Sequence, residues 1–280
     1  MRGTRERSYK DVQFLTELRP FRNYRNIESL ERVCDYLKTE FSKCGLETEE
    51  QTWMAKGNQY SNIIASYRKN KLKRLIVGAH YDVEGNKPGA DDNASAVAGL
   101  LETARLVAEN KPETDYGIDF VAYSLEEPPF FGTESMGSYV HARSLFERMT
   151  PVIGMVCYEM IGYFSDKPGS QKYPEPEMRA MYPDRGNFIM VVGIEKHHNF
   201  SSNFYNLMKD NCGIDVRYIS LPEDNHYAGL SDHRNYWTFG YKAIMINDTS
   251  MLRNKNYHKK SDKIGTLDFE KMTEVVKGCY

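Results

Sequence analysis

Side chains able to bind a metal ion follow three apolar, strand-like runs of the sequence. The runs at 75–79, 120–123 and 152–157 lead respectively into His80, the pair Glu126–Glu127, and Glu159. In an open α/β sheet, ligands bind in the crevice beyond the carboxyl ends of the strands, so these side chains are expected to meet there. Imidazole nitrogen and carboxylate oxygen are donors that zinc accepts. The spacing therefore predicts a metal site built from several strand ends.

A fourth acidic contribution, Asp91–Asp92–Asn93, stands just before a helix-like segment at 94–109. Each group has an ordinary structural explanation when it is taken alone. Asp92–Asn93 can cap the helix, Glu126–Glu127 can lie in a solvated loop, and His80 can be a satisfied core histidine. Together, however, they would gather carboxylates that repel one another, and a bound cation is the simplest way to neutralise such a group.

The elements that must hold these residues alternate between strands and amphipathic helices. Apolar stripes at three- and four-residue spacing predict helices at 27–41, 94–109, 135–146, 200–210 and from Leu267 to the end. Short apolar runs predict strands at 62–67, 75–79, 118–123, 152–157, 188–192, 216–220 and 243–246. This alternation favours an α/β three-layer sandwich, with a central mixed, mostly parallel sheet covered by helices on both faces.

Two connecting segments carry further expectations. The charged run 68–71 separates the strands at 62–67 and 75–79, which predicts a hairpin with a solvated tip. The segment 165–187 is the longest irregular stretch and contains prolines at 168, 174, 176 and 183. Long irregular loops in compact domains are usually functional or disordered, so we expect a loop at the edge of the site.

The composition is that of an ordinary globular protein, with 280 residues of which 40% are hydrophobic and 27% charged. It favours one domain over 1–280. A net charge of -2 gives no electrostatic footprint for nucleic acid. No run approaches the roughly 20 apolar residues of a membrane span. No secretion signal is visible, which predicts a cytoplasmic protein, or a periplasmic or secreted one if a leader was removed. Five cysteines without a C-x-x-C spacing fit a reducing compartment.

Five motifs occur in an order that resembles the M28 family of zinc-dependent aminopeptidases. They are Gly78–Asp82, Pro88–Ser95, Glu126–Glu127, Glu159–Gly162 and Tyr257–Asp262. The match runs from about Ile63 to Met272, whereas the region before about Asn58 contributes no motif. The resemblance implies the phosphorylase/hydrolase-like fold of zinc exopeptidases, with a motif-bearing core over about 60–275.

The resemblance implies two zinc ions that share one carboxylate, with Asp92 as the bridge. His80 and Glu159 would complete the first metal group. Glu127 and His258 would complete the second. Three protein ligands per ion leave a position open for water. Spacing alone does not decide between adjacent acids, so the choice within each doublet rests on the resemblance. Many relatives carry Asp where this chain has Glu159, which leaves its binding mode open. Cobalt or manganese also accepts these donors.

Residues behind the ligands are expected to orient them. Asp82 is placed to accept the second ring N–H of His80 and so fix its tautomer. Asp91 is assigned to the same supporting role, and the resemblance implies a cis peptide bond within Asp92–Asn93. Ser231–Asp232–His233 has the letters of a serine-hydrolase triad but no nucleophile elbow accompanies it, so we interpret it as crevice lining.

The resemblance also implies a mechanism. A water that bridges the metals would be the nucleophile, because metal binding can lower its pKa to about 7. Glu126 would take the proton as general base and return it to the departing amine. The hydroxyl of Tyr257 would donate to the tetrahedral oxyanion. The leading hypothesis is therefore an aminopeptidase that acts on peptides with a free N-terminus.

Two other functions stay open on the sequence. Glutaminyl cyclases have a similar fold and keep most of these ligand positions while working with one zinc, so the ligands alone do not exclude cyclisation of an N-terminal glutamine. A non-catalytic binding domain of the same fold is the third hypothesis. Such domains usually lose ligands, whereas this chain has competent side chains at every position. Neither the side-chain preference nor the oligomeric state follows from the sequence.

Overall fold

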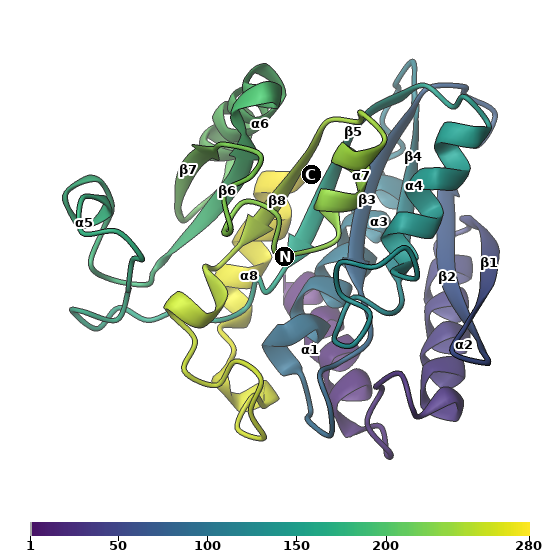
Figure 1. The fold of residues 1–280 in the computed structure, drawn as a ribbon, viewed down its shortest axis with the longest axis horizontal. Helices are drawn as coiled ribbons and strands as arrows, with labels where there is room; N and C mark the ends of the chain where they lie inside the picture. The colour runs from purple at the N-terminus through teal and green to yellow at the C-terminus, as the bar shows by residue number, and fades with distance from the viewer. Residues whose placement is uncertain (1) are drawn as a thin grey trace.

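One eight-stranded sheet runs through the computed structural model, which describes residues 2–280 (Figure 1). Its strands are β1 (Glu47–Ala55), β2 (Asn58–Tyr67), β3 (Arg74–His80), β4 (Gly117–Tyr123), β5 (Val152–Glu159), β6 (Phe188–Ile194), β7 (Asp215–Leu221) and β8 (Ala243–Asn247). Their order across the sheet is β1-β2-β4-β3-β5-β8-β6-β7. The central strands β4, β3, β5 and β8 are parallel, as are β6 and β7, while the pairs β1–β2, β2–β4 and β6–β8 are antiparallel.

Helices form a layer on each face of this sheet. They are α1 (Arg2–Glu17), α2 (Ile27–Lys43), α3 (Ala96–Asn110), α4 (Gly137–Glu147), α5 (Met178–Met181), α6 (His198–Asn211), α7 (His233–Thr238) and α8 (Phe269–Cys279). Side chains alternate along a strand, so β4 sends Phe120 to one core and Val121 to the other. The layer of α1, α2, α3, α6 and α8 covers the first face, and α4 and α7 cover the second. The predicted three-layer sandwich is confirmed.

The predicted hairpin between the strands at 62–67 and 75–79 is wrong. β2 and β3 are not neighbours, because β4 lies between them and pairs with both. The connector instead crosses the end of β4, where Arg68 donates to the Thr114 carbonyl and Arg74 pairs with Asp119. β3 is an almost continuous buried run, which is typical of a central parallel strand, and β4 and β5 pair with it in parallel on its two edges, so no edge is left for β2.

The other predicted helices and strands lie within a few residues of the observed elements, but four elements, α1, β1, α5 and α7, were not predicted. β1 is a polar edge strand with most of its side chains exposed or half-buried. α1 carries charge on its outer face while Val12 and Leu15 are fully buried. α7 is only six residues long. Within residues 2–280, no helix combines the length and the apolar character that a membrane crossing needs.

Candidate metal centre

The predicted ligands come from five separate segments. His80 is the last residue of β3 and Glu159 the last residue of β5, while Glu127 lies in the loop that follows β4. Asp92 lies in the turn Ala90–Ser95 that leads into α3, where the backbone of Asp92 and Asn93 departs from helical dihedrals. His258 lies in the loop between β8 and α8. The carboxyl ends of the parallel strands therefore meet the turn before α3, as the sequence predicts.

Gly89 shapes the turn that presents Asp92. It has a φ of 59°, in the left-handed region, and a Cβ at this position would collide with the carbonyl oxygen of Asp92 and with Val83. A glycine is thus required for the chain to fold back so tightly before the helix. The peptide bond between Asp92 and Asn93 is cis, which confirms that prediction.

Asp92 lies between the two histidines, with one carboxylate oxygen toward each. Its Oδ1 is 3.6 Å from His80 Nε2, and its Oδ2 is 3.0 Å from His258 Nε2. On the far sides, Glu159 Oε2 is 3.2 Å from His80 Nε2, and Glu127 Oε2 is 3.4 Å from His258 Nε2. The donors therefore lie as expected for two metal groups that share the Asp92 carboxylate, with His80 and Glu159 on one side and Glu127 and His258 on the other.

Glu126 faces the first of these groups. Its Oε2 lies 3.7 Å from His80 Nε2, and it forms a compact set of possible ligands with His80 and Glu159. Asp92, Glu127 and His258 form the second such set. Burial raises the pKa of Glu126 well above its usual value. The carboxylate is close enough to act beside the ligands, and its assignment as a base stays a prediction.

The pKa values of Glu127, His258 and His80 are all raised in this crowded acidic site. Burial raises the pKa of Glu127 to about 7, and the charge of Asp92 adds to the shift. Burial disfavours the charged form of His258, yet hydrogen bonds with Asp92 and Glu127 raise its pKa to about 10. Burial also disfavours the charged form of His80, but the surrounding carboxylates, Glu159 and Glu126 foremost, together outweigh it and raise the pKa of this histidine. A divalent cation would supply the missing charge, and nitrogen and carboxylate donors fit zinc.

Asp82 supports the loop that carries the glutamates. Its carboxylate accepts the backbone N–H of Glu126 at 3.1 Å and that of Glu127 at 3.2 Å. The predicted contact with His80 is longer, at 3.5 Å from Nδ1 to Asp82 Oδ1, and the Nδ1 atom has no hydrogen-bond partner among the described residues. Asp82 therefore positions the glutamates through the backbone more directly than it positions His80.

The acidic doublet at 91–92 is divided between two environments. Asp91 turns away from the histidines and accepts the N–H of Gly162 at 3.0 Å and the side-chain N–H of Asn254 at 2.6 Å. Asp262 accepts the backbone N–H groups of Asp91 and Asp92. Only Asp92 of the doublet offers its carboxylate to the predicted metal groups, and Asp91 and Asp262 hold the turn from behind.

Ser231 has a role in the site that sequence reasoning missed. Its hydroxyl donates to Glu159 Oε2 at 2.7 Å. The interpretation of Ser231–Asp232–His233 as crevice lining is wrong, since all three residues are fully buried and none lines the cavity. Burial raises the pKa of Asp232 to about 7. The tripeptide lies behind the first metal group, and nothing local in the sequence indicates the contact with Glu159.

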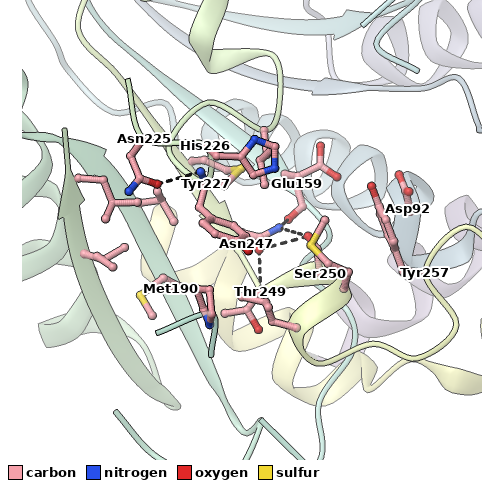
Figure 2. Close-up of a pocket in the computed structure, with 18 of the residues that line it drawn as sticks. Asp92, Glu159, Met190, Asn225, His226, Tyr227, Asn247, Thr249, Ser250 and Tyr257 are labelled. Atoms are coloured by element: carbon pink, nitrogen blue, oxygen red, sulfur yellow. Dashed lines mark hydrogen bonds between the residues drawn. The ribbon is translucent and has the colours of Figure 1, made fainter. Parts of the chain in front are cut away.

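A cavity of about 450 Å³ opens beside the donors. In Figure 2, Asp92 and Tyr257 lie on one side of it, with Met190 and Asn225 on the other. The segment 165–187 contributes several lining residues, as expected of a functional loop, and Figure 1 shows α5 extending away from the sheet beside β6 and β7. The wall opposite the donors is mainly apolar and includes Tyr173, Met178, Met190, Val192, Ile219, Leu221 and Met245.

The sequence profile of Peptidase family M28 matches residues 62–279, a range that holds every predicted ligand. The chain belongs to peptidase family M28. The uncharacterized protein YfbL of Escherichia coli is 42% identical over 98% of this chain and 85% of its own length. Leucine aminopeptidase 1 of Trichophyton rubrum is 25% identical over 86% of this chain and 67% of its own length. The family and the leucine aminopeptidase relative support a peptidase.

Solved structures share the M28 exopeptidase fold with this chain. The LapA aminopeptidase of Legionella pneumophila has a TM-score of 0.78 at 21% identity, covering 98% of this chain and 69% of its own. A glutaminyl cyclase of Bacteroides thetaiotaomicron has a TM-score of 0.71 at 21% identity, covering 98% and 95%. The fold is therefore shared with both an aminopeptidase and a glutaminyl cyclase.

Proposed function

We propose that this M28 peptidase is a metallo-aminopeptidase that holds two zinc ions. The observation that carries the proposal is the position of Asp92, which directs one carboxylate oxygen toward His80 and the other toward His258. His80 and Glu159 would hold the first ion together with Asp92. Glu127 and His258 would hold the second ion with the same aspartate. Two zinc ions in these positions would supply a Lewis acid and lower the pKa of a nearby water.

Glu126 carries the proton in the proposed reaction. Its carboxylate lines the cavity, and its Oε2 atom lies 3.7 Å from His80 Nε2. Glu126 would accept the proton of the attacking water and pass it to the amine that leaves when the C–N bond breaks. Glu159 also lines the cavity, so the free N-terminus of a substrate would approach the acidic end of the cavity.

Tyr257 supplies a hydrogen-bond donor where charge develops. Its ring stacks on His258 with centroids 3.8 Å apart, and the residue lines the cavity. Burial raises the pKa of Tyr257, reinforced by the charge of Asp92, so the phenol keeps its proton. The hydroxyl would therefore donate to the oxyanion formed from the scissile carbonyl.

The apolar wall of the cavity indicates the side chain that the enzyme removes. Met178, Met190 and Met245 line this wall, and methionine adapts to ligands of different shape. We expect leucyl, methionyl and phenylalanyl substrates to be preferred over glycyl and aspartyl ones. Each missing methylene in such a pocket costs about 1–3 kcal/mol of discrimination. Met190→Ala should lower kcat/KM for leucyl substrates while the zinc content stays at the wild-type value.

The deciding experiment combines metal analysis with hydrolysis of aminoacyl chromogenic substrates, before and after chelation. We expect close to two zinc ions per chain and release of the N-terminal residue that the chelator abolishes. Glu126→Gln should keep the zinc and lose hydrolysis, which separates the base from the ligands. A metal-free protein from zinc-replete cells would refute the metal pair and favour a binding domain.

Glutaminyl cyclisation is the second candidate, because cyclases share this fold at a similar TM-score. In that reaction the substrate's own α-amine attacks its glutamine side chain and ammonia leaves, so no peptide bond is broken. A peptide with N-terminal glutamine distinguishes the two activities. Ammonia release from an intact chain, together with one bound zinc, would support the cyclase and contradict the aminopeptidase.

A further inference from the structure

Arg22 is a fully buried arginine in the segment between α1 and α2, a region that contributes no catalytic motif. Its guanidinium donates to backbone carbonyls only. Nε donates to the Tyr81 oxygen at 2.8 Å, and Nη1 to the oxygens of Leu15 at 3.0 Å and Pro88 at 2.6 Å. Nη2 donates to the Gly89 oxygen at 2.6 Å. One side chain therefore ties both ends of the loop 81–89 to α1.

The same segment holds the loop 81–89 at two further points. The carbonyl oxygen of Arg22 accepts the N–H of Val83 at 3.1 Å. The side chain of Asn23 donates to the Gly85 oxygen at 2.9 Å. The loop is thus fixed at its start, its middle and its end by two consecutive residues, Arg22 and Asn23.

This loop positions ligands of the second metal group. It begins directly after His80, and it ends at Gly89, three residues before Asp92. In its middle, the backbone N–H of Glu84 donates to Glu127 Oε1 at 3.0 Å. A shift of the loop would therefore displace two ligands. Asp92 would move because it follows the loop in the chain, and Glu127 would move because it is hydrogen-bonded to the loop. His258 lies outside the loop and would stay in place.

Arg22 also places a positive charge behind the acidic site. Burial lowers the pKa of its guanidinium to about 10, while the charges of Asp262 and Asp92 act in the opposite direction, so it stays charged at neutral pH. The planar guanidinium of arginine carries several N–H groups in fixed directions, so it can donate to several carbonyl oxygens at once. A lysine keeps the charge but offers donors from one point only, so it cannot hold both ends of the loop.

We propose that Arg22 is a positioning residue of the metal centre, which sets the metal affinity of the Asp92–Glu127–His258 group by fixing the loop 81–89. This inference rests on the proposed metal pair, but its test needs no substrate. Partners of metal ligands typically change metal affinity by about 10–100-fold when they are removed. Arg22 contacts the loop and not a ligand itself, so Arg22→Lys should weaken zinc binding at the second group by about 10-fold, the lower end of that range, and change the first group less.

The experiment titrates chelator-stripped full-length protein with zinc against a competing chelator, for wild type and variants. Arg74→Lys is the matched control, because Arg74 is also buried, donates to the Arg68 carbonyl at 3.0 Å and lies at the opposite end of β3. We expect both variants to lower the melting temperature but only Arg22→Lys to weaken zinc binding. Wild-type affinity at both groups in a folded Arg22→Lys protein would overturn the proposal.

Two further measurements keep the test decisive. If Arg22→Lys does not fold, Asn23→Ala removes a single tie to the same loop and should weaken the second group by a smaller factor. Unchanged zinc affinity in that variant overturns the proposal. Wild-type protein that binds fewer than two ions overturns the metal pair itself, and with it this inference, before any variant is compared.

Discussion

Replacing Ser231 with alanine tests how the first metal group is built. The hydroxyl of Ser231 donates to Glu159 Oε2, the oxygen that also lies 3.2 Å from His80 Nε2. A hydrogen bond to a charged group contributes about 1.5–3 kcal/mol. Since about 1.4 kcal/mol corresponds to a factor of ten in an equilibrium constant, its loss should weaken zinc binding at the first group by about 10–100-fold.

The assay is a competition titration of zinc-free protein, which resolves the two binding steps. Ser231→Thr keeps a hydroxyl and should recover most of the affinity. Ser201→Ala is the matched control, since Ser201 is equally buried but contacts Tyr218 and the His198 carbonyl on α6. Wild-type zinc affinity in Ser231→Ala would refute the reasoning, because Glu159 would then be held in place without the hydroxyl.

Three other outcomes follow from the same contacts. His258→Ala should retain one zinc and lose the other, because it removes the histidine of the second group; two zinc ions by elemental analysis would exclude it as a ligand. Burial lowers the pKa of His141 to about 4, whereas the ordinary pKa of histidine is about 6.5. Acidification below about pH 6.5 therefore protonates this histidine in the unfolded protein first, and the free energy of unfolding falls by about 2 kcal/mol at pH 5. In denaturant titrations, the free energy of unfolding of His141→Asn should fall by about 2 kcal/mol less than that of the wild type between about pH 7.5 and pH 5. The same fall in both proteins would contradict this prediction. Asp119→Asn leaves Arg74 buried without its charged partner and should cost about 3–5 kcal/mol of unfolding free energy at unchanged zinc content.

Much of the site could be predicted because its residues stand at strand ends. An apolar run that stops at His80 or just before Glu159 marks both the end of a strand and the start of a polar environment. Parallel strands point their carboxyl ends in one direction, so such residues converge whatever the order of strands in the sheet. This explains why His80, Glu126–Glu127 and Glu159 could be placed in one crevice while the neighbours of β3 were predicted wrongly. The full ligand set, with Asp92 and His258, came from the resemblance to the M28 family.

The residues that hold the ligands could not be predicted, because their contacts are distant in sequence. Arg22 lies in a stretch of arginines and aromatics with one proline that looks like an ordinary surface segment, and its partners in the loop 81–89 lie about sixty residues further along. Ser231 is separated from Glu159 by 72 residues. Neither position has a periodicity or a motif of its own, and a hydrogen bond between distant segments becomes visible only once the sheet order is known.

The choice between hydrolysis and cyclisation depends on water rather than on the fold. Hydrolysis needs a water molecule held where it can attack the scissile carbonyl, whereas cyclisation uses the amine of the substrate as the nucleophile. An aspartate shared by two complete donor groups is an arrangement that hydrolysis can use to place and activate that water. Here Asp92 directs one oxygen to each histidine, and Glu126 lies beside them with no ligand role required of it. A single-zinc cyclase has no need for both groups, so a second zinc bound through Asp92, Glu127 and His258 would be strong support for hydrolysis.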